Sequence, residues 1–274
     1  MKLLVTGKGG SGSWKIRGEQ LGQAIGADVI PKASQDQLKK RDVTLIVKKS
    51  TLEIAKYATG KKVWDVIDHW PQPMGNDWDK DKLTAHILRQ AEAIKASYLI
   101  CATEQQRKDL AGDFTLYHHH RPNIKINPIR ERVQTVGYEG DIRFLGKWTK
   151  LLMQECTKRG WALLFNPPEL ASCDIIVALR DFPFKGYATD NWKSNVKLAN
   201  AQGSGTPIIC NREAGYMETE SGAEIYADTP QELIAGFDVL RHQGERLVRS
   251  RALLDSAYTL EDAAGDLKGF LSGL

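Results

Sequence analysis

The first 117 residues alternate short apolar runs with amphipathic segments. The apolar runs are typical of buried strands, which we expect at residues 3–6, around 29, and at 43–47, 62–67, 98–102 and 114–117. Residues 83–96 instead repeat apolar side chains at helical spacing, with Leu83, Ile87 and Ala91 on one face. Further helices are expected after residue 14 and at 104–110. Apolar strands separated by helices are typical of a parallel sheet covered on both faces.

The second half repeats this plan. We expect strands at residues 133–137, 161–165, 174–179, 206–210 and 223–226, and helices at 145–159, 194–202, 229–240 and 245–274. Two prolines and two asparagines at 121–128 indicate an irregular connection between the halves. The predicted fold is α/β, with two Rossmann-like doubly wound domains facing a central cleft. The domains are expected at 1–125 and 126–255, with a helix at 256–274 crossing back to the first.

Composition agrees with a globular protein. The chain has 274 residues, of which 42% are hydrophobic and 26% charged, a balance that excludes a disordered chain. No apolar stretch approaches the roughly 18 residues that a membrane helix needs, and the N-terminus does not resemble a signal peptide. Four scattered cysteines have neither zinc-site nor disulfide-framework spacing. We therefore expect a cytoplasmic protein without a membrane span.

Charge is distributed unevenly along the chain. Residues 1–125 contain 21 Lys and Arg against 14 Asp and Glu, although the net charge of the whole chain is only +4. Such an asymmetry favours an anionic partner for the first half.

A glycine-rich loop, Gly7-Lys8-Gly9-Gly10-Ser11-Gly12, follows the first predicted strand and precedes a helix. This context is typical of a phosphate-binding turn. A dinucleotide-binding domain would also place an acidic residue at the end of the second strand, but Val29–Ala33 contains none. An NAD oxidoreductase is thus disfavoured. Gly9 and Gly10 are expected instead to let the backbone approach a donor or acceptor, although the loop could be an unliganded turn.

The second half has a more specific pattern before its strand at 206–210. The predicted helix starts at Ser194, so its free N–H groups and positive dipole end could hold a diphosphate. Lys193 and Lys197 add positive charge there, and Ser194 and Asn195 add polar groups. Alternatively, Ser194 only caps the helix and the lysines are solvated.

The stretch that follows resembles the GT-B glycosyltransferases. Gly205-Thr206-Pro207-Ile208-Ile209 is similar to the family's helix–glycine–proline–strand motif, and Gly215-Tyr216-Met217-Glu218 to its glycine loop and glutamate. The resemblance covers most of residues 133–240. It implies a nucleotide-sugar co-substrate, metal-independent catalysis and no other cofactor. It also implies donor-binding roles for Gly9, Gly10, Arg180, Lys193, Ser194, Asn195, Lys197 and Glu218.

The sequence departs from the paired-glutamate subgroup of that family. The two carboxylates of that pattern would fall near Trp192 and Asn200, neither of which is acidic. The stereochemical outcome of the reaction is therefore left open.

A candidate base follows the strand at 62–67. Asp68 and His69 are adjacent, and a carboxylate or an imidazole can accept the proton of an attacking hydroxyl. We take both as catalytic candidates. The alternative is that Asp68 caps the Trp70-Pro71 turn and that His69 packs beneath it.

Two other clusters have metal-like compositions. His118-His119-His120 cannot all face one ion if they lie on a strand, because successive side chains point to opposite faces. Asp77-Trp78-Asp79 precedes a helix, where aspartates favour the helix dipole. We therefore expect no metal site.

The acceptor is expected on the basic first domain. Lys8, Lys48 and Lys49 follow strands there and could bind phosphates. The chain also resembles phage-encoded glycosyltransferases, some of which modify DNA. The favoured acceptor is therefore a hydroxymethylated pyrimidine in double-stranded DNA, in an infected host cell, and the enzyme is expected to be a monomer. The alternatives are a carbohydrate or lipid-linked acceptor, or a non-catalytic protein that binds nucleotides or DNA.

Overall fold

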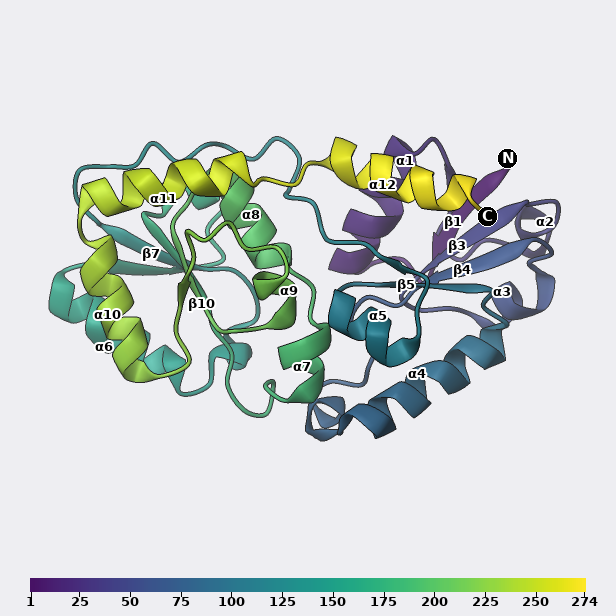
Figure 1. Ribbon diagram of the computed structural model, residues 1–274, viewed down its shortest axis with the longest axis horizontal. Coiled ribbons are helices and arrows are strands. Elements are labelled where there is room, and N and C mark those ends of the chain that lie inside the picture. The colour runs from purple at the N-terminus through teal and green to yellow at the C-terminus, as the bar shows by residue number, and fades with distance from the viewer. The chain divides into compact units, whose positions relative to one another are not determined.

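The computed structural model describes all 274 residues, apart from the side chain of Leu52. The chain divides into two compact units, whose helices and strands are labelled in Figure 1. The first unit comprises Met1–His118, Tyr187–Ser194 and Leu260–Leu274. The second comprises His119–Gly186 and Asn195–Thr259. Each unit contains one parallel sheet with helices, which confirms the predicted α/β class with two Rossmann-like sheets.

The sheet of the first unit has six parallel strands in the order β2-β1-β3-β4-β5-β6. Its strands are β1 (Leu3–Gly7), β2 (Asp28–Val29), β3 (Val43–Val47), β4 (Lys61–Asp65), β5 (Tyr98–Cys101) and β6 (Phe114–Thr115). Its helices are η1 (Trp14–Gln20), α1 (Leu21–Ala24), α2 (Gln35–Leu38), α3 (Leu52–Tyr57), η2 (Met74–Asp77), α4 (Lys80–Ile94), α5 (Glu104–Leu110), α7 (Tyr187–Trp192) and α12 (Leu260–Ser272).

The sheet of the second unit has five parallel strands in the order β11-β10-β9-β7-β8. Its strands are β7 (Thr135–Tyr138), β8 (Ala162–Phe165), β9 (Ile175–Ala178), β10 (Ile208–Cys210) and β11 (Ile225–Tyr226). Its helices are η3 (Ile142–Leu145), α6 (Trp148–Arg159), η4 (Leu170–Ser172), α8 (Val196–Ser204), α9 (Ala214–Met217), α10 (Pro230–Leu240) and α11 (Gln243–Asp255).

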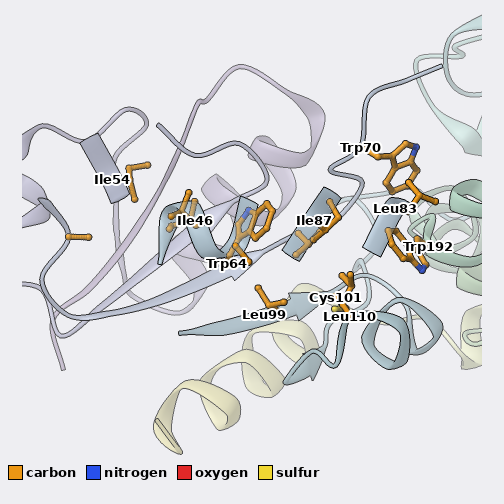
Figure 2. Close-up of a cluster of buried hydrophobic side chains, with 14 of the residues drawn as sticks. Ile46, Ile54, Trp64, Trp70, Leu83, Ile87, Leu99, Cys101, Leu110 and Trp192 are labelled. Atoms are coloured by element: carbon orange, nitrogen blue, oxygen red, sulfur yellow. The ribbon is translucent and has the colours of Figure 1, made fainter. Parts of the chain in front are cut away.

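Three tryptophans pack the segment Tyr187–Ser194 against the core of the first unit. Trp64 on β4, Trp70 in the loop after it and Trp192 at the end of α7 are buried in one hydrophobic cluster (Figure 2). The Trp70 and Trp192 rings meet edge to face with their centroids 6.5 Å apart. The indole N–H of Trp192 also donates to Asp109 over 2.8 Å. The segment Tyr187–Ser194 is thereby part of the first unit, although it follows β9 of the second.

The last helix also belongs to the first unit. Phe270 of α12 stacks on Phe114 of β6 with ring centroids 4.8 Å apart, and its edge meets Tyr98 of β5. Residues 245–274 were expected to be helical, with a helix at 256–274 returning to the first domain. They contain α11 in the second unit and α12 in the first.

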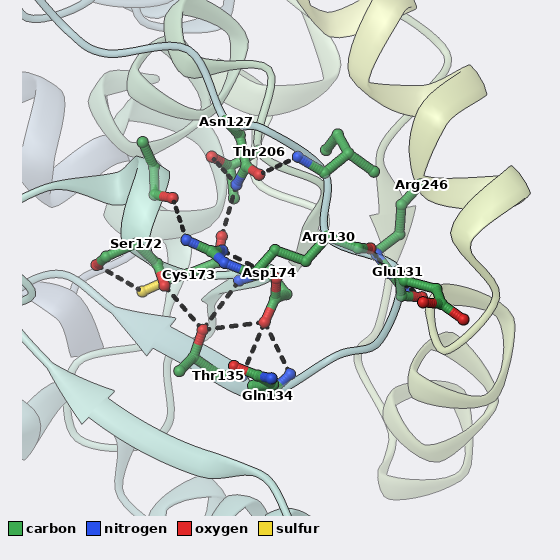
Figure 3. Close-up of polar contacts among 12 residues, drawn as sticks. Asn127, Arg130, Glu131, Gln134, Thr135, Ser172, Cys173, Asp174, Thr206 and Arg246 are labelled. Carbon is green, nitrogen blue, oxygen red and sulfur yellow. Dashed lines mark hydrogen bonds and ion pairs between the residues drawn. The ribbon is translucent and has the colours of Figure 1, made fainter.

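The irregular connection at 121–128 lies within the second unit, since the first unit's opening segment ends at His118. Its side chains are tied to the second sheet by the polar contacts shown in Figure 3. The Asn127 amide donates to the carbonyl of Cys173 over 2.6 Å. Just after this connection, Arg130 is ion-paired with buried Asp174 at 3.0 Å. These bonds stabilise a segment that lacks a regular backbone pattern.

Two helices begin differently from the prediction. The helix expected from Ser194 begins at Val196, with Asn195 as N-cap and no capping bond from the Asn195 side chain. Residues Trp14–Gln20 form a π-helix rather than an ordinary α-helix. π-Helical turns are rare in proteins, and those that occur are frequently found at functional sites.

Candidate functional site

Two pockets of the first unit lie beside the loops that follow β1, β3 and β4. The larger has a volume of 440 Å³ and is lined by residues that include Lys8, Lys49, Trp64, His69 and Gln90. The smaller has a volume of 260 Å³ and is lined by Lys8, Lys49 and the glycine loop, among others. Parallel strands bring the loops at their carboxyl ends to one edge of a sheet, where ligands of such folds bind.

Asp68 is buried beside these loops and ion-paired with Lys193. The backbone N–H of Ser194 also donates to Asp68 over 3.4 Å. Burial by itself would raise the pKa of Asp68, but the charges of Lys193 and Lys48 outweigh it and lower that pKa well below its usual range. Asp68 is therefore a stable carboxylate at neutral pH and a weak base.

His69 lines the larger pocket, and its hydrogen bonds define which ring nitrogen carries the proton. Its ring meets Trp64 edge to face at a centroid distance of 5.3 Å. Its Nε2 is bonded to Oε1 of Gln90, whose amide nitrogen is bonded in turn to Nε2 of His86. In this chain of bonds Nε2 of His69 is the donor, so Nδ1 carries the lone pair. Burial lowers the pKa of His69 to about 4, and the imidazole is neutral at physiological pH.

A second buried polar group lies behind Asp68. Asp65 ends β4, and its carboxylate is 3.9 Å from the guanidinium of Arg17 on the π-helix. Arg17 Nε also donates to Nδ1 of His118 over 3.1 Å. Burial raises the pKa of Asp65 to about 6, against the opposing effect of Arg17. Neither Asp65 nor Arg17 was among the residues predicted from the sequence.

The glycine loop and the lysines after β3 lie together. Gly9 and Gly10 have positive φ angles of 77° and 67°, a conformation that favours glycine. The backbone N–H of Lys8 donates to the carbonyl of Lys49 over 3.0 Å, which joins the two loops. Lys48 is half-buried and close enough to Asp68 to lower the pKa of that carboxyl. Gly9 and Gly10, predicted for the donor, thus line the same pocket as Lys8, Lys48 and Lys49, predicted for the acceptor.

In the second unit, Lys197 lies beside the loop that follows β7. Its ammonium is 4.2 Å from the centroid of the Tyr138 ring. A Cβ on Gly140, whose φ is +125°, would stand 3.5 Å from Nζ of Lys197. A glycine loop and a buried lysine on the first turn of α8 therefore face each other within this unit. Asn195, the N-cap of that helix, bonds Thr219 through its amide over 3.4 Å.

Arg180 follows β9 and is buried. Its Nε donates to the buried carboxylate of Glu213 over 2.8 Å, and its guanidinium lies 5.5 Å from the ring centroid of Phe144. Glu218 caps the C-terminal end of α9 and is half-buried. Arg180 is thus held by Glu213, a glutamate that was not predicted from the sequence.

No protein-family model and no curated protein matches this chain. Solved structures do match it over its whole length. The Anabaena protein Alr3699/HepE in complex with UDP-glucose superposes with a TM-score of 0.69 at 11% identity, covering 100% of both chains. The apo lipopolysaccharide outer core galactosyltransferase WaaB gives a TM-score of 0.56 at 10% identity, again over 100% of both chains.

This chain has the GT-B fold. The fold is also compatible with other chemistry. The UDP-GlcNAc 2-epimerase from Neisseria meningitidis, bound to UDP-GlcNAc, superposes with a TM-score of 0.52 at 10% identity over 100% of both chains. A fold does not by itself define a reaction, so the residues of the site have to decide it.

Compared with the paired-glutamate GT-B pattern, both carboxylate positions have structural roles here. Trp192 is packed in the core of the first unit. The Asn200 amide donates to Glu139 over 3.3 Å, and its oxygen accepts the backbone N–H of Arg121 over 2.9 Å. Trp192 and Asn200 therefore stabilise the fold through packing and hydrogen bonds.

The predicted site residues fall into two separate sets. The first unit contains nine of them: Lys8, Gly9, Gly10, Lys48, Lys49, Asp68, His69, Lys193 and Ser194. The second unit contains the other four: Arg180, Asn195, Lys197 and Glu218. The unexpected members are Lys193 and Ser194, which were predicted to begin a second-unit helix. Trp192 precedes them in the sequence. Because its side chain is buried in the core of the first unit, it also places Lys193 and Ser194 in that unit.

Residues of the histidine cluster at 118–120 and the aspartate cluster at 77–79 make hydrogen bonds that stabilise the fold. His118 accepts from Arg17, while the Nδ1 atoms of His119 and His120 bond backbone carbonyls. Asp79 caps α4 by accepting the N–H of Lys82 over 2.8 Å. Among the residues that the structure describes, no group of three His, Cys, Asp or Glu could hold a metal ion. None of the described helices is long and apolar enough to cross a membrane.

Proposed function

We propose that this protein is a glycosyltransferase that moves a sugar from a nucleotide-sugar donor to a hydroxyl acceptor. The observation that carries the proposal is the full-length similarity of fold to a structure in complex with UDP-glucose, at a TM-score of 0.69. The arrangement of charged and polar groups within each unit supports it.

The donor is assigned to the second unit. The Gly140 loop allows close approach of a ligand, and the buried ammonium of Lys197 beside it would neutralise a diphosphate. Asn195 would add a hydrogen bond, Glu218 would bind hydroxyls of the ribose or sugar, and Arg180 remains a phosphate candidate from the end of β9. Since Lys193 and Ser194 are engaged by Asp68, Lys197 is the stronger candidate for the diphosphate. These protein cations would stabilise the leaving group without a metal or another cofactor.

The proton acceptor is assigned to His69. As the acceptor oxygen bonds to the anomeric carbon and the nucleoside diphosphate leaves, the hydroxyl proton would pass to Nδ1 of His69. The bond to Gln90 supports this role because it keeps the proton of the neutral ring on Nε2. Asp68, ionised and adjacent in sequence, would stabilise positive charge that develops in the loop.

For the acceptor, the excess of basic residues in the first half favours DNA that carries a hydroxymethylated pyrimidine, as in phage DNA modification. A carbohydrate or lipid-linked acceptor is the alternative. We further propose that the enzyme acts as a cytoplasmic monomer.

A panel assay tests the function. The protein is incubated with UDP-glucose, UDP-GlcNAc and GDP-fucose, with hydroxymethylated DNA or with oligosaccharide acceptors, and mass spectrometry follows both substrates. A glycosyltransferase releases the nucleotide and adds one hexosyl or related mass to the acceptor. An epimerase would give an epimeric sugar of unchanged mass, which NMR of the donor detects, without a gain in acceptor mass. Binding of donor and DNA without any product would instead favour the non-catalytic alternative.

A further inference from the structure

The two pockets of the first unit share one basic wall. Lys8 and Lys49 line both of them, and Lys48 lines the smaller one as well. None of the described residues that line either pocket is acidic. The nearby carboxylates form ion pairs with other cations, Asp68 with Lys193 and Asp65 with Arg17. Lys48 also contributes to the charge balance of Asp68, whereas Lys8 and Lys49 are exposed, so their ammonium groups are accessible to a ligand.

The smaller pocket has the form of an anion site. Gly9 and Gly10 are among its lining residues, and the space beside Gly10 is open, since a Cβ added there would meet nothing within 4 Å. Glycines leave the main chain accessible, and backbone amide N–H groups can bind a ligand oxygen. Its volume of 260 Å³ is smaller than that of the other pocket. Three lysines line this pocket, which favours an anion such as a phosphate as its ligand.

The larger pocket offers neutral hydrogen bonds away from that basic wall. Ser50 and Thr51 contribute hydroxyls, His69 and Gln90 contribute an imidazole and an amide, and Ile94 contributes an apolar surface. Its volume of 440 Å³ is within the range of small-molecule sites. Such a lining suits an uncharged, hydroxylated ring.

We infer that the acceptor carries a phosphate group, with its hydroxylated ring in the larger pocket and its phosphate in the smaller pocket between Lys8, Lys48 and Lys49. This inference rests on the proposed function only in calling the ligand an acceptor. The ring is then placed at His69, and the lysines hold the phosphate away from that residue. The same chemistry is found in a free sugar phosphate or nucleotide and in one nucleotide of a DNA strand.

Calorimetry with matched ligand pairs tests the inference. Glucose is compared with glucose 6-phosphate, and 5-hydroxymethyldeoxycytidine with its 5′-monophosphate. Inorganic phosphate and a duplex that contains 5-hydroxymethylcytosine complete the set. For the wild type we expect the phosphate of at least one pair to improve affinity by about tenfold or more, as a charge-assisted contact does. Given that gain, a duplex that binds more tightly than the 5′-monophosphate would identify DNA as the source of the phosphate, and a duplex that binds no better would identify a free phosphorylated compound.

The variant Lys8→Ala/Lys49→Ala should lose this gain, and Lys8→Arg/Lys49→Arg should keep most of it. Lys39→Ala/Lys40→Ala removes the same charge from exposed sites of the same unit and should keep it entirely. Thermal melting establishes that each variant is folded. If no phosphate ligand binds better than its neutral counterpart, or if the alanine variant keeps the gain, the inference is wrong. Titration with UDP-glucose, UDP-GlcNAc and GDP-fucose separates the two proposals, since phosphate-dependent binding without binding of any of these donors would reject only the proposed function.

Discussion

The carboxylate of Asp68 is ion-paired with Lys193, which lies 125 residues further along the chain. The pair joins the loop after β4 to the end of the segment that contains α7, and both partners belong to the first unit. It also lowers the pKa of Asp68, so the carboxylate stays charged beside His69 over the whole physiological range.

Replacing Lys193 by methionine should make the activity sensitive to acid. Without the ammonium, burial is opposed by fewer favourable contacts, mainly Lys48, His118 and the N–H of Ser194, so the pKa of Asp68 should rise. On acidification, Asp68 of the variant would then become protonated at a higher pH than Asp68 of the wild type. We expect the acid limb of kcat/KM against pH to move upward by about one unit or more. An unchanged acid limb would show that Asp68 is not required as an anion.

Asp68→Asn and His69→Gln should each reduce kcat by about 10² to 10⁴ while the donor Kd stays within about twofold. His69 is the proposed proton acceptor, and Asp68 supplies the neighbouring charge. His242→Gln, an exposed histidine of the second unit, is the matched control and should retain full activity. Product formation by mass spectrometry and donor titration by calorimetry measure the two quantities. Two fully active variants would remove both residues from the reaction.

His69 should also make the fold less stable in mild acid. The pKa of His69 is lowered to about 4 in the folded chain, whereas an unfolded histidine titrates near 6.5. Between these values the unfolded state binds more protons, so stability falls as the pH decreases from 6.5 to 4. His69→Gln should lose less stability than the wild type over that window in urea unfolding. Equal slopes for the two proteins would contradict the lowered pKa.

Lys197→Ala should weaken donor binding by about 10- to 100-fold, the range expected for one hydrogen-bonded charge. The buried ammonium lies beside the Gly140 loop, where we place the diphosphate. Calorimetry with UDP-glucose measures the effect. Lys158→Ala, at an exposed position on α6, is the control and should bind the donor like the wild type. Equal affinity for the Lys197 variant would move the diphosphate elsewhere.

Trp192→Ala should destabilise the first unit by about 3–5 kcal/mol, as large truncations in a core do. Trp192 is fully buried and contacts Trp70 in that core. Trp192→Phe should recover most of the loss, because it restores ring packing without the N–H bond to Asp109. Urea unfolding gives both values. A loss below about 1 kcal/mol for the alanine variant would mean that the segment from Tyr187 to Ser194 is not held by this ring.

The sequence alone determined most of the strands and the sheet edge at which the candidate residues lie. Apolar runs at 43–47 and 98–102 favour buried strands of a covered sheet, and the loops that follow parallel strands share one edge. Lys8, Lys49 and His69 were chosen as candidates because each lies in a loop that follows a predicted strand, and these three residues line one pocket.

Only the tertiary structure decided which unit holds Lys193 and what surrounds Asp68. The chain at 187–194 follows a strand of the second sheet and precedes the helix predicted from Ser194, so its order in the sequence assigns it to that unit. The burial of Trp192 in the first core outweighs this order in sequence. Asp65 and Arg17 likewise meet on different elements of the fold. Contacts between residues so far apart in the chain depend on packing, which no local periodicity encodes.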